Sequence, residues 1–261
     1  MLRFMMIMLI LSISFGSFAQ NKLLFSEFVE SAFDVKSPTA TDNDQRWILG
    51  VELGATMTTG NTDTQTYKAK LSGAYFYPVW RMNYFAQLLD KTDNGNKKVN
   101  KWKLGAKVNR DFSATNSSFA TIEYEEDQFS QYDALATFST GYTHRLYNKN
   151  NIMWDADVGP GVRWIKSDAH TKEQQVLTVL HLGTNLLLPL SKHAEFGQVI
   201  VSDIGLTTDS STVIRSESTL TANVLDNLKM KFSYTMRHDS MPGMIKENLD
   251  TQTSLTLLMT F

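Results

Sequence analysis

The chain has 261 residues, a formal charge of -2 and no cysteine. Its length suits one large domain or two small ones. The near balance of charge gives no electrostatic reason to expect nucleic-acid binding, which a strongly basic domain would suggest. The lack of cysteine excludes a disulfide framework, thiolate metal sites and cysteine nucleophiles.

Residues 1–19 have the pattern of a secretory signal peptide. Arg3 supplies a positive start, residues 4–13 are apolar, and Ser17 and Ala19 place small residues at a cleavage point before Gln20. The apolar run is too short to cross a membrane comfortably, which argues against a permanent anchor. We therefore expect export and removal of this segment.

Residues 20–45 follow a different pattern from the rest of the chain. Phe25, Phe28, Val29, Ala32 and Phe33 fit the helical template, and Pro38 would stop a helix. Two hypotheses remain open for this periplasmic N-terminal segment. It is either a frayed terminus or a short amphipathic helix that rests on a membrane surface or plugs a pore.

From residue 46 onward the hydrophobic period changes to two, which is typical of β-strands with one apolar face. No later apolar run is long enough for a transmembrane helix. The alternation is least regular in the eighth and ninth segments. The pattern predicts twelve strands at about 47–57, 67–77, 80–88, 101–108, 120–125, 136–143, 154–164, 174–188, 194–206, 215–224, 229–237 and 250–261.

The connections between these segments alternate in length. Those within "YPVW", "LYNKNN" and "VLDNL" are short, whereas "LDKTDNGNKKV", "IKSDAHTKEQ" and "RHDSMPGMIKEN" are long and polar. This alternation predicts an all-β, antiparallel up-and-down transmembrane β-barrel over residues 46–261, with short periplasmic turns and longer extracellular loops. A soluble exported β-sandwich that binds a ligand is the alternative, because period alone does not say which face is outside.

Aromatic residues mark the strand ends and favour the membrane barrel. The ten-residue step from Trp154 to Trp164 covers ~33 Å of strand, which a tilt of about 40° reduces to ~25 Å, the height of a lipid-facing band. We expect interfacial positions for Trp47, Tyr67, Tyr77, Trp80, Trp102, Trp154, Trp164 and Phe261. Pro160 lacks an N–H, so we also predict a local break in strand pairing near it, through a bulge or kink, on the lipid side.

The final strand ends on Phe261, as in outer-membrane proteins delivered to the barrel-assembly machinery. That resemblance implies the outer membrane of a Gram-negative bacterium as the location. It also implies outer-membrane lipids and the assembly machinery as partners.

The face opposite the apolar one carries charges at mid-strand positions. Two hypotheses stand for it: a selective pore with a basic wall beside an acidic one, or a structural ion-pair network across neighbouring strands. The lumen-lining candidates are Lys68, Lys70, Arg81, Lys101, Lys103, Lys107, Glu123, Glu125, Asp155, Asp157, Arg163, Arg215 and Glu217.

Motifs for catalysis or cofactors are weak. The five histidines show no metal-ligand spacing, and nucleotide-binding and hydrolase motifs are lacking. "RHDS" brings His238 and Ser240 close in sequence, but neighbouring strand residues point to opposite faces. We expect no cofactor, no metal and no enzyme activity. An outer-membrane lipid hydrolase that uses His238 and Ser240 is the alternative.

Four motifs occur in an order that resembles a known family: "ELGATMTTGNTDTQT", "YEEDQFSQYD", "DVGPGVR" and the terminal "MRHDSMPG…DTQTSLTLLMTF". Together, over residues 46–261, they resemble domain of unknown function family 481 (DUF481), the YdiY-like salt-induced outer-membrane proteins. The resemblance implies an outer-membrane barrel. The family has no established activity, so it implies no catalytic residues.

Overall fold

The computed structural model describes residues 47–58, 64–127, 132–167, 174–207, 210–241 and 248–260. The signal peptide and N-terminal segment expected over 1–45 therefore lie outside the described residues, as does Phe261. Within the described ranges, no helix is long and apolar enough to cross a membrane. The strands are β1 (Trp47–Thr58), β2 (Thr64–Tyr77), β3 (Trp80–Asp93), β4 (Asn96–Asp111), β5 (Asn116–Asp127), β6 (Tyr132–Lys149), β7 (Ile152–Ser167), β8 (Gln174–Pro189), β9 (Ala194–Gly205), β10 (Val213–Asn223), β11 (Leu228–Asp239) and β12 (Leu249–Thr260).

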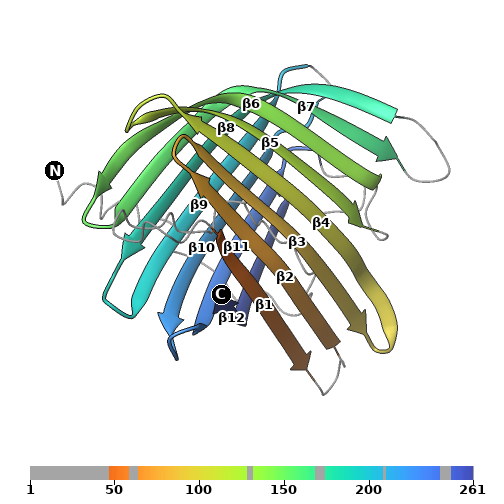
Figure 1. Ribbon diagram of the computed structural model, residues 1–261. Helices are drawn as coiled ribbons and strands as arrows, with labels where there is room; N and C mark the ends of the chain where they lie inside the picture. Colours follow the sequence, from red (N-terminus) through yellow and green to blue (C-terminus); the bar gives the residue numbers. More distant parts are fainter. Residues whose placement is uncertain are drawn as a thin grey trace, which may run out of the picture.

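The twelve strands form one closed barrel in which sequence neighbours pair antiparallel and β12 returns to β1 (Figure 1). The predicted twelve-stranded up-and-down barrel is confirmed. The alternation of side chains fits this closed form, because each strand presents an apolar face to the outside of the barrel and a polar face to its interior.

The connections divide the barrel into two ends. At the short-turn end, β2–β3, β4–β5, β6–β7, β8–β9 and β10–β11 are joined by two to four residues. The opposite, long-loop end holds longer connections, such as 168–173 and 240–248. One expectation for this end was wrong. The stretch around residues 89–99 is a hairpin rather than a loop, because Asn94 and Gly95 adopt positive φ angles of 48° and 76° and so allow a two-residue turn.

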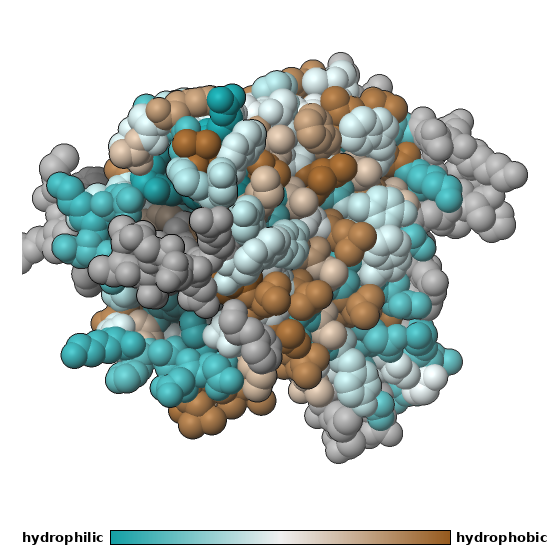
Figure 2. Space-filling view, in the orientation of Figure 1, coloured by the Kyte–Doolittle hydropathy of each residue, from teal (hydrophilic) through white to brown (hydrophobic). Residues whose placement is uncertain are grey.

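Many outward-facing large side chains are apolar or aromatic, and Figure 2 shows apolar side chains gathered on the face that it views. Aromatic rings lie near both ends of the barrel. Near the short-turn end, Trp47 packs against Tyr75 with ring centroids 4.3 Å apart. Near the long-loop end, Trp102 and Tyr124 lie 4.9 Å apart. Of the expected interfacial residues, Trp47, Tyr77, Trp80 and Trp154 lie towards the short-turn end, and Tyr67, Trp102 and Trp164 towards the other.

Pro160 lies on the outer face of β7, at a gap in the β6–β7 ladder. Pairing runs through Ser139–Gly161 and resumes at Tyr142–Val158. The predicted break is therefore confirmed on the β6 side. The register is the same before and after the gap, so a bulge was the wrong expectation, and the ladder to β8 is continuous past Pro160.

Candidate functional site

All thirteen lumen-lining candidates have side chains on the inner face of the barrel. They occupy the strand positions whose neighbours point outward, and most are nearly inaccessible to solvent. Charged groups are rarely buried to this degree unless they are paired. The geometry of their pairing therefore decides what the lumen can do.

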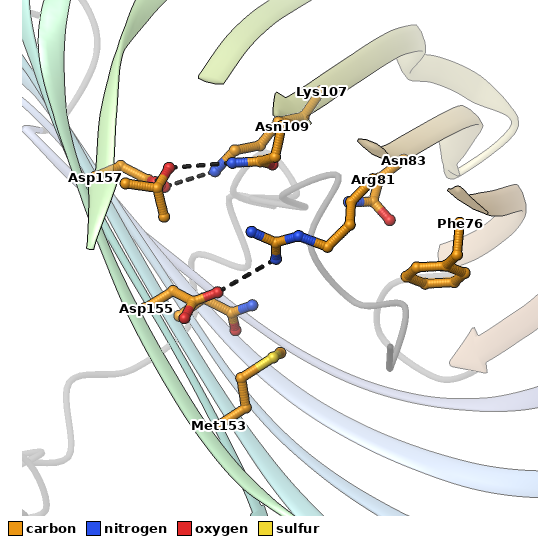
Figure 3. Close-up of a pocket in the computed structure, with 10 residues that line it drawn as sticks. Phe76, Arg81, Asn83, Lys107, Asn109, Met153, Asp155 and Asp157 are labelled. Atoms are coloured by element: carbon orange, nitrogen blue, oxygen red, sulfur yellow. Dashed lines mark hydrogen bonds and ion pairs between the residues drawn. The ribbon is translucent and has the colours of Figure 1, made fainter. Parts of the chain in front are cut away.

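Near the short-turn end, an ion pair in the lumen joins two strands that are not neighbours. Lys107 Nζ of β4 lies 2.6 Å from Asp157 Oδ2 of β7, three strands away, and both side chains are 4% exposed. Thr143 donates a hydrogen bond to the other oxygen of Asp157, and Asn109 donates to Thr143 at 3.1 Å. Figure 3 shows these groups reaching toward each other across the interior. The carboxylate of Asp157 is thus held by two strands other than its own.

A second carboxylate on β7 gathers two arginines. Asp155 accepts two hydrogen bonds from Arg145, at 2.8 and 3.1 Å. Arg81 of β3 lies 3.6 Å from Asp155 across the lumen and donates to Asp111 at 2.9 Å (Figure 3). The two-bond contact fixes the guanidinium of Arg145 in one orientation.

The middle of the lumen is bridged by Arg215 of β10. Its guanidinium lies 2.6 Å from Glu123 of β5 and 2.9 Å from Asp203 of β9. Glu123 also pairs with Lys103 at 3.1 Å, and Asp203 accepts a hydrogen bond from His181 Nδ1 at 2.8 Å when that nitrogen carries the ring proton. This chain of contacts connects the β4–β5 wall to the β8–β10 wall.

Two further clusters of ion pairs lie in the lumen. On one side, Lys101 pairs with Glu125 at 2.8 Å, and Arg237 of β11 approaches the same carboxylate at 3.7 Å. Behind β1, Glu52 accepts from Lys68 at 2.9 Å and lies 3.4 Å from Lys231. Each cluster again joins strands that are not sequence neighbours.

Very little open space remains among these side chains. The cavity beside Arg81, Lys107 and Asp157 has a volume of about 30 Å³, and the one beside Lys103, Arg163 and Arg215 about 20 Å³. Such volumes hold about one or two water molecules. At these two places the described side chains occupy most of the lumen and leave room for little more than water.

Sequence reasoning missed several members of this network. Lys–Glu pairs between β4 and β5 follow from their adjacency, and the structure contains them. The contacts across the lumen do not follow from adjacency, and Glu52, His181, Asp203, Lys231 and Arg237 were not among the candidates. For Glu52, Lys231 and Arg237 a signal was available, because each alternates along its strand with apolar residues and therefore belongs to the inward-facing set. The irregular patterns of β8 and β9 concealed it for His181 and Asp203.

Asp239 and Ser240, beside His238 at the end of β11, accept hydrogen bonds from backbone N–H groups. Ser240 accepts the N–H of Thr212 at 2.8 Å, and Asp239 accepts that of Met241 at 3.0 Å. Among the described residues, no hydrogen bond joins His238, Asp239 and Ser240 to one another, and no cluster of three His, Asp or Glu side chains could hold a metal ion.

Comparison with known proteins agrees with this fold. The translocator domain of the autotransporter NalP from Neisseria meningitidis superposes with a TM-score of 0.52 at 10% identity, covering 84% of this chain and 89% of that one. An outer membrane channel, COG4313, from Pseudomonas putida F1 gives 0.47 at 8% identity over 82% and 94%, and the NanC porin gives 0.46 at 10% over 81% and 98%. No curated protein matches. The family model "Protein of unknown function, DUF481" matches residues 51–261, so the chain belongs to this family of proteins of unknown function.

Proposed function

We propose that this protein is an outer-membrane β-barrel whose lumen is closed in its resting state, so that it serves as a structural barrel of the envelope rather than as an open pore. Residues 1–19 would direct export in a Gram-negative bacterium. The apolar outer face would contact outer-membrane lipids between the two sets of aromatic rings. The barrel-assembly machinery would recognise the final strand, and the short-turn end would face the periplasm.

The observation that carries the closed lumen is the set of ion pairs across it. Lys107–Asp157 joins β4 to β7 and Arg215–Glu123 joins β10 to β5 through the lumen, at 2.6 Å each. A hydrated solute would have to separate both pairs in order to pass. Since the cavities beside these pairs hold no more than a few waters, the resting barrel should conduct poorly.

A gated narrow channel is the second candidate, and the chemistry of the closure favours it. Burying ion pairs is often no better than packing apolar side chains of the same volume, because desolvation offsets their attraction. A barrel that only needed sealing could use Leu and Phe instead. A seal of ion pairs, by contrast, leaves a polar path once the pairs separate.

Planar-bilayer conductance tests the proposal. Refolded wild-type protein, shown to be folded by its heat-modifiable gel mobility, should give no stable conductance steps. A Lys107→Met, Arg215→Met double variant, which removes both bridging cations, should conduct if the network is the gate. Lys97→Met, which removes an exposed lysine at the long-loop end, is the matched control.

The outcomes separate the two candidates. Stable steps in the wild type would show that the closed-lumen proposal is wrong. A silent wild type with a conducting double variant favours the gated channel. Silence in both, with folding intact, favours the structural barrel.

A further inference from the structure

The seam between the first and last strands has far fewer residue pairs in register than any other seam of the barrel. β1 and β12 are in register over four residue pairs only, from Gly50–Thr260 to Leu53–Leu257. Every other neighbouring pair of strands is in register over ten or more. The barrel is therefore closed at its short-turn end and unpaired along this seam toward its long-loop end.

Two strand edges face this unpaired half. Residues 54–58 continue β1 beyond the paired region, and they remain paired with β2 on their other side. Residues 249–256 of β12 likewise remain paired with β11. In both segments every second residue directs its backbone N–H and C=O toward the seam. The apolar layer of a membrane offers no water to satisfy such groups, so an open edge there calls for a partner.

The base of the open half is held by a side-chain tie. Thr256 Oγ1 of β12 donates to Glu52 of β1 at 2.8 Å, and Lys231 of β11 approaches the same carboxylate at 3.4 Å. The paired third of the seam is thus fixed by both backbone and side-chain bonds.

A lipid chain is one conceivable occupant of the open half. An acyl chain lying in the seam would cover both backbone edges without forming a hydrogen bond to either of them. An acyl chain is therefore a poor occupant.

Strand direction decides which polypeptide fits. β1 and β12 run antiparallel to each other, so one inserted strand would be antiparallel to one edge and parallel to the other. A second copy of this chain, related by a two-fold axis along the membrane normal, places its β12 edge against β1 and its β1 edge against β12. Both contacts are then antiparallel, and both copies keep the same orientation in the membrane.

The outer surface beside the seam suits a second barrel. Leu53, Leu255 and Leu257 project outward there, each more than half exposed. Next to them, an apolar hollow of about 340 Å³ crosses β1 to β4, with Ala69 and Ala86 among its lining residues. Figure 2 shows apolar side chains gathered over this front wall. Large side chains of a facing barrel could enter the hollow.

We infer that the open half of the β1–β12 seam is a docking edge for a second copy of this chain, which forms a two-fold dimer by exchanging β1–β12 pairing at the long-loop end. The inference rests on the proposed membrane location, since in water the free edges would be solvated. It does not depend on whether the lumen conducts.

Cysteine cross-linking tests the dimer without background, because the chain has no cysteine. Ala55 and Leu255 would be opposite each other if the register continued, and both side chains are exposed. Ala55→Cys and Leu255→Cys should be placed on separate, differently tagged copies, co-expressed and oxidised in membranes. We expect a covalent heterodimer between the two tags. The control pair, Leu53→Cys and Leu257→Cys on separate copies, lies in the seam that closes within one chain and should give little.

The same two substitutions placed in one chain test whether the seam instead closes within a single copy. A 55/255 double variant that forms only an internal disulfide, migrating as a monomer, would show that the seam closes on itself. Thiols that stay free in both experiments would show that water or lipid occupies the seam. Either result overturns the dimer. Heat-modifiable mobility and membrane fractionation of each variant are scored separately, so failure of the membrane location is distinguishable from failure of the dimer.

Discussion

The Lys107–Asp157 pair gives the sharpest test of the lumen network. We consider Lys107→Met, which keeps most of the length of the side chain and removes its charge. Both partners are 4% exposed and 2.6 Å apart, so the variant leaves a carboxylate buried among walls that admit little water. Breaking a buried pair from one side costs about 3–5 kcal/mol. Asp157 keeps its bond from Thr143, so we expect the lower end, about 3 kcal/mol.

The double variant Lys107→Met, Asp157→Leu separates the charge effect from packing. It removes both charges and fills similar volume, so it should recover most of the loss, because apolar replacement of a buried pair is often neutral or stabilising. Lys97→Met is the control. Its partner Asp90 lies at a similar 2.7 Å, but the side chains are 53% and 37% exposed, so the expected cost is below about 1 kcal/mol.

The measurement is reversible urea unfolding of the refolded barrel in lipid vesicles, followed by tryptophan fluorescence and by heat-modifiable mobility. The argument fails if Lys107→Met costs no more than Lys97→Met. It also fails if the double variant is as unstable as the single one. Either result would mean that water reaches Asp157 and that the lumen is more open than its geometry indicates.

Two further predictions concern the wall of the barrel. Gly159→Ala should destabilise the barrel by about 1–3 kcal/mol, because the new Cβ would collide with the carbonyl oxygen of Thr140. The control is Gly197→Ala, whose Cβ would collide only with the hydroxyl of Thr219, a side-chain group that can move. The control should cost less in the same unfolding experiment. In single-tryptophan variants that retain Trp154 or Trp164, lipids brominated near the head group should quench the tryptophan fluorescence more than lipids brominated in the middle of the acyl chain. Stronger quenching by the mid-chain bromine would contradict the interfacial placement.

The fold could be predicted from the sequence because a membrane barrel repeats one simple rule. Alternation such as that of Trp102, Leu104 and Ala106 against Lys101, Lys103 and Lys107 specifies the faces of a strand locally, and the last strand needs only to find the first. The Asn94–Gly95 hairpin was missed for a related reason. Its polar flanks continue β3 and β4 beyond the apolar band, where alternation carries no hydrophobic signal.

The lumen network could be predicted only in part. Pairing between β4 and β5 depends on adjacency, which a sequence reveals once strands are assigned. The reach of Arg215 to Glu123, or of Lys107 to Asp157, depends on how the barrel is flattened and tilted, and no local pattern encodes that. The short seam is equally invisible, since β1 and β12 both alternate cleanly over residues that remain unpaired with each other.

The buried charges also help to choose one strand register. A slip of one residue turns every side chain of a strand to the other face. For β4 this would place Lys101, Lys103 and Lys107 in lipid, at about 2–4 kcal/mol for each lysine near the membrane midplane. An apolar seal would impose no such penalty, because strands with two apolar faces pair almost equally well in either register. The ionic lumen can therefore be retained even though it offers no advantage in stability over apolar packing, because it excludes the misregistered barrels that apolar packing would permit.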